Sequence, residues 1–298
     1  MEWKRVKGQI LEDAPMRRYT SMKVGGPARY LAYPVDAPDL VRVVEIAKAK
    51  RMSHRFLGNG TNVIVGDRGV DHAVIRITKM RHMQFEKRAN GVRAEVSGGI
   101  SLQRFIRECA GRGLSGIEKL YGIPGTVAGA IKMNAGSFGV AVSDHLLSVT
   151  YLDRAGRLET RAKSELPFGY RTSSFAPSDC ILGAAFELAF GEKVEIRKVM
   201  EQVWSERWEK HPMELPSAGS IFKNTGGKPA WKYIDEVGLR GYRMGNACIS
   251  EKHPNFIVNL GGARASDVVG LIRKIEQEVY DRLGVTMEKE VELWGCDG

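Results

Sequence analysis

The chain has 298 residues, of which 43% are hydrophobic and 27% charged, a composition typical of a globular protein and not of a disordered chain. Its formal net charge of +10 and its isoelectric point of about 9.4 favour anionic partners, either nucleic acid or small phosphorylated ligands. Lysine and arginine are spread over most segments and do not form a stripe with interleaved aromatic residues, which indicates a solvated basic surface.

The four cysteines are widely separated and include no Cys-x-x-Cys pair. Their spacing excludes the usual zinc motifs and does not resemble a secreted disulfide framework, so we expect no metal site and reduced thiols. The N-terminal residues are polar and no long apolar run follows them. We therefore expect neither a signal peptide nor a membrane span, and a cytoplasmic location.

The hydrophobic pattern predicts a mixture of helices and short strands in irregular order, after a polar lead-in that ends near Tyr19. The expected helices cover residues 38–51, 101–110, 193–210, 230–237 and 266–283, and the expected strands cover 55–57, 62–65, 148–152, 157–160, 181–189, 255–260 and 285–294. Because strands and helices do not alternate regularly, this order favours an α+β fold over a doubly wound parallel sheet. Prolines and glycines crowd the chain after residue 212 and indicate a domain boundary there.

The first candidate site is the turn of Gly58, Asn59, Gly60, Thr61 and Asn62, which follows a predicted strand. Successive backbone N–H groups in such a turn can bind phosphate oxygens, and the side chains of Thr61 and Asn62 add polar groups. The turn lacks the third glycine and following helix of a dinucleotide-binding fingerprint, and no Gly-Lys-Ser/Thr follows it. Asn-Gly between two apolar runs is also typical of a β-hairpin, so both interpretations stay open.

A second glycine-rich segment lies between residues 122 and 139. Its candidate cofactor-binding residues are Gly125, Thr126, Gly129, Asn134, Ala135 and Gly136. Two such segments in one domain favour a dinucleotide cofactor with two phosphates, although a tightly packed structural crossing would show the same composition.

Arg171 is flanked by aromatic residues in the sequence 168–175. Its guanidinium could bind a substrate carboxylate through two oxygens, or it could stack on Tyr170 at the surface. The local sequence does not decide between the two.

The segment 216–224 brings several polar groups into one short loop, among them Ser220, Lys223 and Asn224. It does not have the Gly-x-Ser-x-Gly pattern of a hydrolase. A serine beside Gly219 could simply shape a turn.

The last predicted strand has an alternating pattern that places Glu288, Glu290 and Glu292 on one face. A solvated polar face explains this pattern equally well, and periodicity does not single out one of the three glutamates.

Taken together, these segments resemble the UDP-N-acetylenolpyruvoylglucosamine reductases, the flavoenzyme family commonly called MurB. The matching segments are 20–28, 57–65, 122–139, 170–175, 216–224, 250–259 and 288–291, which span nearly the whole chain in the family's order. The resemblance implies an FAD-binding module of the vanillyl-alcohol oxidase (PCMH) type, followed by a smaller α+β substrate-binding domain. The expected division is a lead-in over 1–20, an FAD-binding domain over 21–191, a connecting helix over 192–212 and a substrate-binding domain over 213–298.

The resemblance also implies roles for particular residues. The glycine-rich segments would hold the FAD diphosphate, with residues 134–136 nearby. Arg171, Ser220 and Glu290 would be catalytic, and Tyr170, Lys223 and Asn224 would contact the substrate. Thr61 stands where the family commonly has serine, and no insertion carrying a lid tyrosine is evident, which suggests the shorter second type of the enzyme.

The implied chemistry is the reduction of UDP-N-acetylglucosamine enolpyruvate to UDP-N-acetylmuramate, with NADPH as the reductant of FAD. A hydride from flavin N5 would add to the terminal enolpyruvyl carbon, and negative charge would develop on the substrate carboxylate. Arg171 and Glu290 would stabilise that charge, which requires Glu290 to hold or share a proton, and Ser220 would supply the proton to carbon.

Two other functions remain as alternatives. One is an oxidase of the vanillyl-alcohol type, but such enzymes often attach the flavin to a histidine in the glycine-rich turn, where this chain has Asn59 and Thr61. The other is a basic nucleic-acid-binding protein, whose affinity would fall steeply with salt. The partners expected from the resemblance are the UDP-sugar substrate and NADPH, with neither nucleic acid nor membrane.

Overall fold

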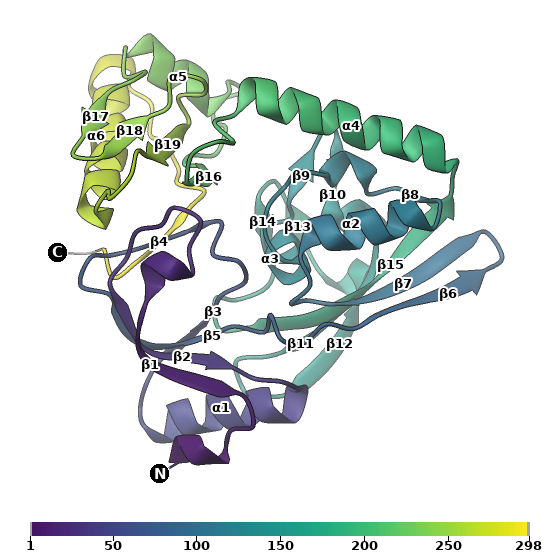
Figure 1. Ribbon diagram of the computed structural model, residues 1–298. Coiled ribbons are helices and arrows are strands. Elements are labelled where there is room, and N and C mark those ends of the chain that lie inside the picture. Colours follow the sequence, from purple (N-terminus) through teal and green to yellow (C-terminus); the bar gives the residue numbers. More distant parts are fainter. Residues whose placement is uncertain (1, 297–298) are drawn as a thin grey trace. The chain divides into compact units, whose positions relative to one another are not determined.

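Two units make up residues 2–296, the part of the chain that the computed structural model describes (Figure 1). The first unit comprises the residues up to Glu12, Tyr30–Asn59 and His72–Ser205. The second comprises Asp13–Arg29, Gly60–Asp71 and the chain from Glu206 onward. The second unit therefore includes two segments from the first quarter of the sequence.

A four-stranded sheet in the order β1-β2-β5-β3 belongs mainly to the first unit. Its strands are Gln9–Pro15 (β1), Pro27–Tyr33 (β2), His54–Phe56 (β3) and Val70–Ile75 (β5). Helix α1 (Ala37–Ala49) begins where the Asp36 side chain accepts the N–H of Asp39 at 2.8 Å, and it buries the apolar stripe predicted from its sequence. The buried carboxylate of Asp39 in turn accepts the N–H groups of Lys7 and Gly8.

The larger sheet of the first unit is antiparallel and has the order β12-β11-β15-β7-β6. Its strands are Met83–Arg88 (β6), Gly91–Ser97 (β7), Leu146–Leu152 (β11), Leu158–Ala162 (β12) and Cys180–Phe190 (β15), with Leu114–Ser115 (β8) paired to the end of β15. Helices α2 (Leu102–Gly111) and α3 (Val127–Lys132) cover one face (Figure 1). The core between them includes Phe105 and Phe186, whose rings lie 5.1 Å apart.

Short elements complete the first unit. They are the 3-10 helices η1 (Glu2–Arg5), η3 (Glu118–Leu120), η4 (Val142–His145) and η5 (Lys163–Glu165), and the strand pairs β9 (Gly136–Ser137) with β10 (Val140–Ala141) and β13 (Phe168–Gly169) with β14 (Thr172–Ser173). The segment η2 (Met16–Arg18) belongs to the second unit, and helix α4 (Lys193–Lys210) belongs to both.

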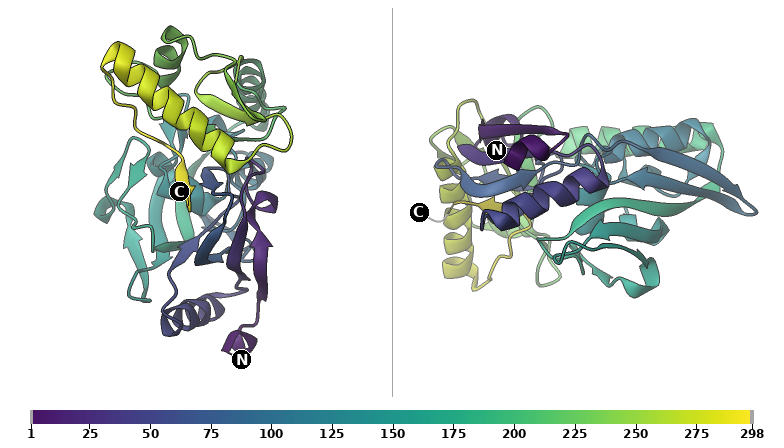
Figure 2. Two further views of the ribbon diagram at one scale, coloured as in Figure 1. Left: turned by 90° about the vertical axis from the view of Figure 1, so that its left-hand side faces the viewer. Right: turned by 90° about the horizontal axis from the view of Figure 1, so that it is seen from below.

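The second unit is built on a sheet in the order β16-β19-β18-β17. Its strands are Ser217–Ser220 (β16), Arg243–Met244 (β17), Ala247–Ile249 (β18) and Phe256–Asn259 (β19), and its helices are α5 (Ala230–Glu236) and α6 (Ala265–Leu283). Helix α6, yellow in Figure 2, packs its apolar stripe against this sheet and ends at Gly284, which has a left-handed φ of 67°. Strand β4 (Val63–Val65) pairs in parallel with β20 (Glu292–Trp294).

The helices expected from periodicity are confirmed with shifts of one or two residues at their ends. Ser101, the first residue of the expected helix 101–110, is the N-cap of α2 and accepts the N–H of Arg104 at 3.2 Å. The hairpin interpretation of the first glycine-rich turn is wrong, because β3 pairs with β5 and β4 pairs with β20.

The predicted terminal strand over 285–294 is also wrong in its extent, since only Glu292–Trp294 forms regular strand. The segment before it changes partners along its length. Lys289 forms an isolated bridge with Phe222, the N–H of Glu290 reaches the carbonyl of Ile221, and that of Glu292 reaches the carbonyl of Asn62. The three glutamates therefore do not share one face of a continuous ladder.

Membrane insertion of a helix finds no support within residues 2–296, where every helix is too short or too polar to span a bilayer.

Candidate active site

The two predicted diphosphate-binding segments meet in the first unit at Gly58. A Cβ atom at this position would lie 2.5 Å from Oγ1 of the buried Thr126, so only glycine fits. Thr126 is the N-cap of α3 and accepts the N–H of Gly129 at 3.2 Å. Arg76 donates from Nε to the Gly58 carbonyl at 3.1 Å. The absence of a side chain at Gly58 therefore allows the two glycine-rich segments to pack directly against each other.

The next residues of the same turn belong to the second unit. Gly60 has a φ of 65°, and a Cβ there would lie 2.3 Å from the carbonyl oxygen of Tyr19. Its own carbonyl accepts the N–H of Ser21 at 2.9 Å. Asn62 donates from Nδ2 to the Glu290 carbonyl at 2.9 Å, so this side chain anchors the C-terminal segment. Asn59 and Thr61 are both half-buried.

Arg171 and the segment 134–136 come together in the first unit. Tyr170 and Arg171 form the two-residue turn between β13 and β14, and Arg171 has a left-handed φ of 54°. Its Nη2 donates to the Gly136 carbonyl at 3.1 Å, and its guanidinium lies 5.3 Å from the centre of the exposed Tyr170 ring. Asn134 donates to the Gly169 carbonyl at 2.9 Å and accepts the N–H of Ser143 at 3.3 Å.

These contacts show the proximity to Tyr170 that one interpretation of Arg171 predicted, and carboxylate binding stays a prediction. The arginine stacks on Tyr170, as a surface residue would, and it is also fixed by a backbone carbonyl of the second glycine-rich segment. Ala135 ties this segment to α3 through a 2.8 Å bond from its N–H to the Ala130 carbonyl. A non-glycine residue held at positive φ stores backbone strain, which is common at functional sites.

Ser220 and Glu290 lie on adjacent stretches of chain in the second unit. Ser220 ends β16 and pairs across the sheet with Phe256. The carbonyl of the next residue, Ile221, accepts the N–H of Glu290 at 2.7 Å. The two predicted catalytic residues of this unit are therefore brought together by one backbone bond, although 69 residues of sequence separate that donor and acceptor (290 − 221).

Lys223 and Asn224 continue the same loop. Lys223 donates its N–H to the Glu288 carbonyl at 2.8 Å, and its ammonium lies 2.5 Å from a carboxylate oxygen of Glu288. The Asn224 side chain accepts the N–H of Ala230 at 3.0 Å, where α5 begins. Of the three predicted catalytic residues, Arg171 belongs to the first unit, and Ser220 and Glu290 to the second.

A histidine and aromatic cluster beside β19 did not appear as a candidate in the sequence. The ring of His211 stacks on Phe256 with centroids 5.0 Å apart, and His253 meets both rings edge-on. Burial lowers the pKa of His211 to about 4, helped by the nearby positive charges of His253 and Arg207. Burial likewise lowers the pKa of His253 to about 4. Since Phe256 pairs with Ser220, this cluster supports the strand that carries the serine.

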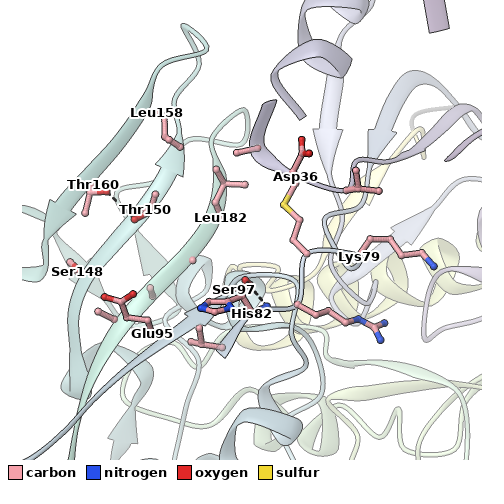
Figure 3. A pocket seen from close by; sticks show the side chains of 18 of the residues that line it. Asp36, Lys79, His82, Glu95, Ser97, Ser148, Thr150, Leu158, Thr160 and Leu182 are labelled. Carbon is pink, nitrogen blue, oxygen red and sulfur yellow. Dashed lines mark hydrogen bonds between the residues drawn. The ribbon is translucent and has the colours of Figure 1, made fainter. Parts of the chain in front are cut away.

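An open groove of about 720 Å³ lies elsewhere in the first unit, on the larger sheet and beside the start of α1 (Figure 3). The predicted site residues do not line it. Three of its hydroxyl groups are bonded within the groove, Thr150 to Thr160 at 2.9 Å and Ser97 to the N–H of His82 at 3.0 Å. The prediction of no metal site is compatible with the described residues, which include no cluster of three or more His, Cys, Asp or Glu side chains suited to a metal ion.

Comparison with protein families shows that the chain contains an FAD-binding domain. The family profile described as "FAD binding domain" matches residues 28–161, which contain Gly58 and the whole second glycine-rich segment. This match confirms the predicted fold class, an FAD-binding α+β module with a C-terminal domain. Within the matched residues the two glycine-rich segments pack directly against each other, at the contact of Gly58 with Thr126.

The particular family follows from the rest of the chain. The profile described as "UDP-N-acetylenolpyruvoylglucosamine reductase, C-terminal domain" matches residues 211–294. A protein of that name from Syntrophus aciditrophicus is 40% identical over 98% of this chain and 94% of its own length. One from Caldicellulosiruptor saccharolyticus is 39% identical over 96% of this chain and 92% of its own. The chain belongs to the UDP-N-acetylenolpyruvoylglucosamine reductase family, as its sequence motifs predicted, and is an FAD-dependent oxidoreductase.

A solved structure supports the same conclusion. The reductase of this family from Thermus caldophilus is 36% identical and superimposes with a TM-score of 0.79, covering 97% of this chain and 99% of that one. The relatives therefore match both units.

Proposed function

We propose that this enzyme reduces UDP-N-acetylglucosamine enolpyruvate to UDP-N-acetylmuramate in the cytoplasm, with NADPH as the reductant, as a step in peptidoglycan precursor synthesis. Family membership over nearly the whole chain supports the reaction, because the relatives named for it match in both units. The observation that carries the assignment of residues is the bond from the Glu290 N–H to the Ile221 carbonyl. This bond keeps the segment of Ser220, the proposed proton donor, beside the segment of Glu290.

FAD, when bound, supplies a hydride acceptor for NADPH and a hydride donor for the terminal carbon of the enolpyruvyl group. The residues proposed to hold its diphosphate are Gly58, Asn59, Gly60, Thr61, Asn62, Gly125, Thr126 and Gly129, with Asn134, Ala135 and Gly136 nearby. We propose that residues 21–191 form the flavin-binding domain and 213–298 the substrate-binding domain, connected by the helix over 192–212.

The reacting double bond is conjugated to a carboxylate, so hydride addition at its far end places negative charge on that carboxylate and the adjacent carbon. Arg171 would offset this charge with a guanidinium already oriented by the Gly136 carbonyl and the Tyr170 ring. Glu290 would act in the same way only if it carries or shares a proton, since a carboxylate would repel the enolate.

Ser220 would then donate its hydroxyl proton to the carbon beside the carboxylate, and water would return a proton to the serine. A serine hydroxyl is a weak acid, but a carbanion is a strong base, so a correctly placed hydroxyl suffices. Tyr170, Lys223 and Asn224 are proposed to contact the substrate. Of these, Lys223 would have to exchange its ion pair with Glu288 for a phosphate.

The test is an anaerobic absorbance measurement on the purified, FAD-loaded protein. Flavin bands that bleach with NADPH and return on adding UDP-N-acetylglucosamine enolpyruvate are the expected result. Return with oxygen alone would indicate an oxidase and contradict the proposal. A protein that takes up no flavin on reconstitution with FAD would contradict it as well.

A further inference from the structure

The side chain of Asn255 holds the residue two positions after Ser220 by both of its polar atoms. Its Oδ1 accepts the Phe222 N–H at 3.0 Å, and its Nδ2 donates to the Phe222 carbonyl at 2.8 Å. The backbone of Asn255 adds a third bond, from the Ile221 N–H to its carbonyl at 2.8 Å. Asn255 and Phe222 are both buried, at 4% and 1% exposure, so water does not compete for these bonds.

These bonds take the place of regular strand–strand hydrogen bonds, which do not continue beyond the end of β16 at Ser220. The register of β16 against β19 shifts between Ser217 and Ser220, where Gly219 takes a φ of 79°. A strand that is irregular just before its functional residue leaves the direction of that residue poorly fixed by ladder bonds alone. The clamp from Asn255 acts directly after the irregularity.

The clamped residues also hold the segment of Glu290. Ile221 accepts the Glu290 N–H, Phe222 bridges to Lys289, and Lys223 donates to the Glu288 carbonyl. The stretch 221–223 therefore lies between Asn255 on one side and residues 288–290 on the other. A shift of this stretch would move Ser220 and alter its spacing from Glu290 at the same time.

We propose that Asn255 is a positioning residue for the proton-transfer step, which sets the placement of Ser220 relative to Glu290 without touching substrate or flavin. The inference rests on the proposed function of Ser220 and Glu290. The clamp needs one donor and one acceptor on adjacent atoms. An aspartate of the same shape would direct a carboxylate oxygen at the Phe222 carbonyl and repel it.

Asn259, the last residue of β19, provides a matched control, since Asn255 lies directly before the first residue of that strand. It is buried to the same extent, donates to the Met22 carbonyl at 3.0 Å and accepts the N–H groups of Gly261 and Ala263. Replacing it with aspartate breaks an equivalent buried amide contact, but one that does not hold residues 221–223.

The experiment compares Asn255→Asp, Asn259→Asp and Ser220→Ala in FAD-loaded protein, with the two half-reactions followed separately by stopped-flow absorbance. For Asn255→Asp we expect flavin reduction by NADPH at the normal rate and reoxidation by UDP-N-acetylglucosamine enolpyruvate about 10- to 100-fold slower, because displacement of a reacting group by about 1 Å costs that much. Its solvent deuterium isotope effect on reoxidation should increase. Asn259→Asp should reoxidise within about twofold of the unmodified protein.

A second readout does not depend on turnover. Amide hydrogen exchange in residues 217–224 should accelerate in Asn255→Asp and stay unchanged in Asn259→Asp. If Asn255→Asp does not fold, Asn255→Ser, whose shorter side chain cannot reach both polar groups of Phe222, takes its place with the same expectation.

The outcomes distinguish the positioning role of Asn255 from the proposed catalytic role of Ser220. Slow reoxidation in Ser220→Ala with normal reoxidation in Asn255→Asp would overturn the positioning role alone. Normal reoxidation in Ser220→Ala would overturn the proposed role of the serine, and the positioning inference with it. Equal slowing in Asn255→Asp and Asn259→Asp would reduce the role of Asn255 to general structural support.

Discussion

The histidine pair of the second unit predicts a loss of stability in mild acid. His211 and His253 have pKa values lowered from 6.5 to about 4, because burial disfavours their charged forms. At a pH between 6.5 and 4 the two histidines are protonated in the unfolded chain and neutral in the folded one. The stability that the neutral pair contributes is therefore complete above pH 6.5 and declines as the pH falls from 6.5 towards 4.

The size of the effect follows from linkage. Consider one histidine that is neutral in the folded chain and protonated in the unfolded chain. For each unit by which the pH falls, it lowers the free energy of unfolding by about 1.4 kcal/mol, which amounts to about 2.7 kcal/mol between pH 6.5 and 4.5. Both rings are partly exposed, so solvent screening reduces this figure. We expect about 1–2 kcal/mol for each ring and about 2–4 kcal/mol for the pair.

The assay is urea unfolding at pH 7.0, 6.0, 5.0 and 4.5, comparing the unmodified protein with the double variant His211→Phe/His253→Phe. Aromatic rings keep the packing around Phe256 but cannot titrate, so the variant should lose less stability over this range by the amount estimated above. Parallel profiles for the double variant and the unmodified protein would show that burial of these two rings does not cause the loss of stability in acid.

Three further substitutions test the site and its support. Gly58→Ala places a Cβ 2.5 Å from Thr126 Oγ1, so we expect about 1–3 kcal/mol lower stability by urea unfolding and weaker FAD binding by fluorescence titration. Asp67→Ala removes a carboxylate that accepts two N–H groups at the start of α6, which should cost about 1 kcal/mol in urea unfolding. Arg171→Lys keeps the charge but loses the fork that binds the Gly136 carbonyl. Flavin reoxidation by the enolpyruvyl substrate should slow at least about tenfold, with flavin reduction unchanged.

Controls are available for the first two. Gly111 has open space around its Cβ direction, so Gly111→Ala should leave FAD affinity unchanged. Asp71 is exposed, and Asp71→Ala should alter stability by less than about 0.5 kcal/mol. For Arg171→Lys, a normal reoxidation rate would contradict the proposed role of the guanidinium.

Helices of this chain could be predicted because their apolar positions recur at helical spacing and their ends carry local signals such as Ser101 and Gly284. The strands β6 and β1 could not, because β6 is half charged and mostly exposed, and β1 lies in a polar segment. Such strands are defined by their partners in the sheet, which local sequence does not specify.

In the candidate site, too, local sequence does not specify which residues become partners. Sequence motifs supplied Ser220 and Glu290, but their adjacency depends on bonds between residues far apart in the chain. Asn62 holds the Glu290 carbonyl across 228 positions, and Asn255 holds Phe222 across 33. A period-two pattern through the glutamates predicted a regular strand instead, because it cannot show where a segment changes partners.

An asparagine side chain can anchor the irregular loops around Ser220 and Glu290, which the hydrogen bonds of a β-ladder cannot do. A ladder fixes alternate residues of two extended strands, whereas the loops around Ser220 and Glu290 depart from extended geometry, as the φ of 79° at Gly219 shows. An asparagine side chain places a donor and an acceptor side by side and can pair with a peptide group outside any ladder. Asn255 does so at Phe222, while Asn62 and Asn259 each donate to one backbone carbonyl of the second unit. Because such an anchor depends on one pair of atoms, an isosteric change to aspartate should disturb the site more than loss of an apolar neighbour of similar size.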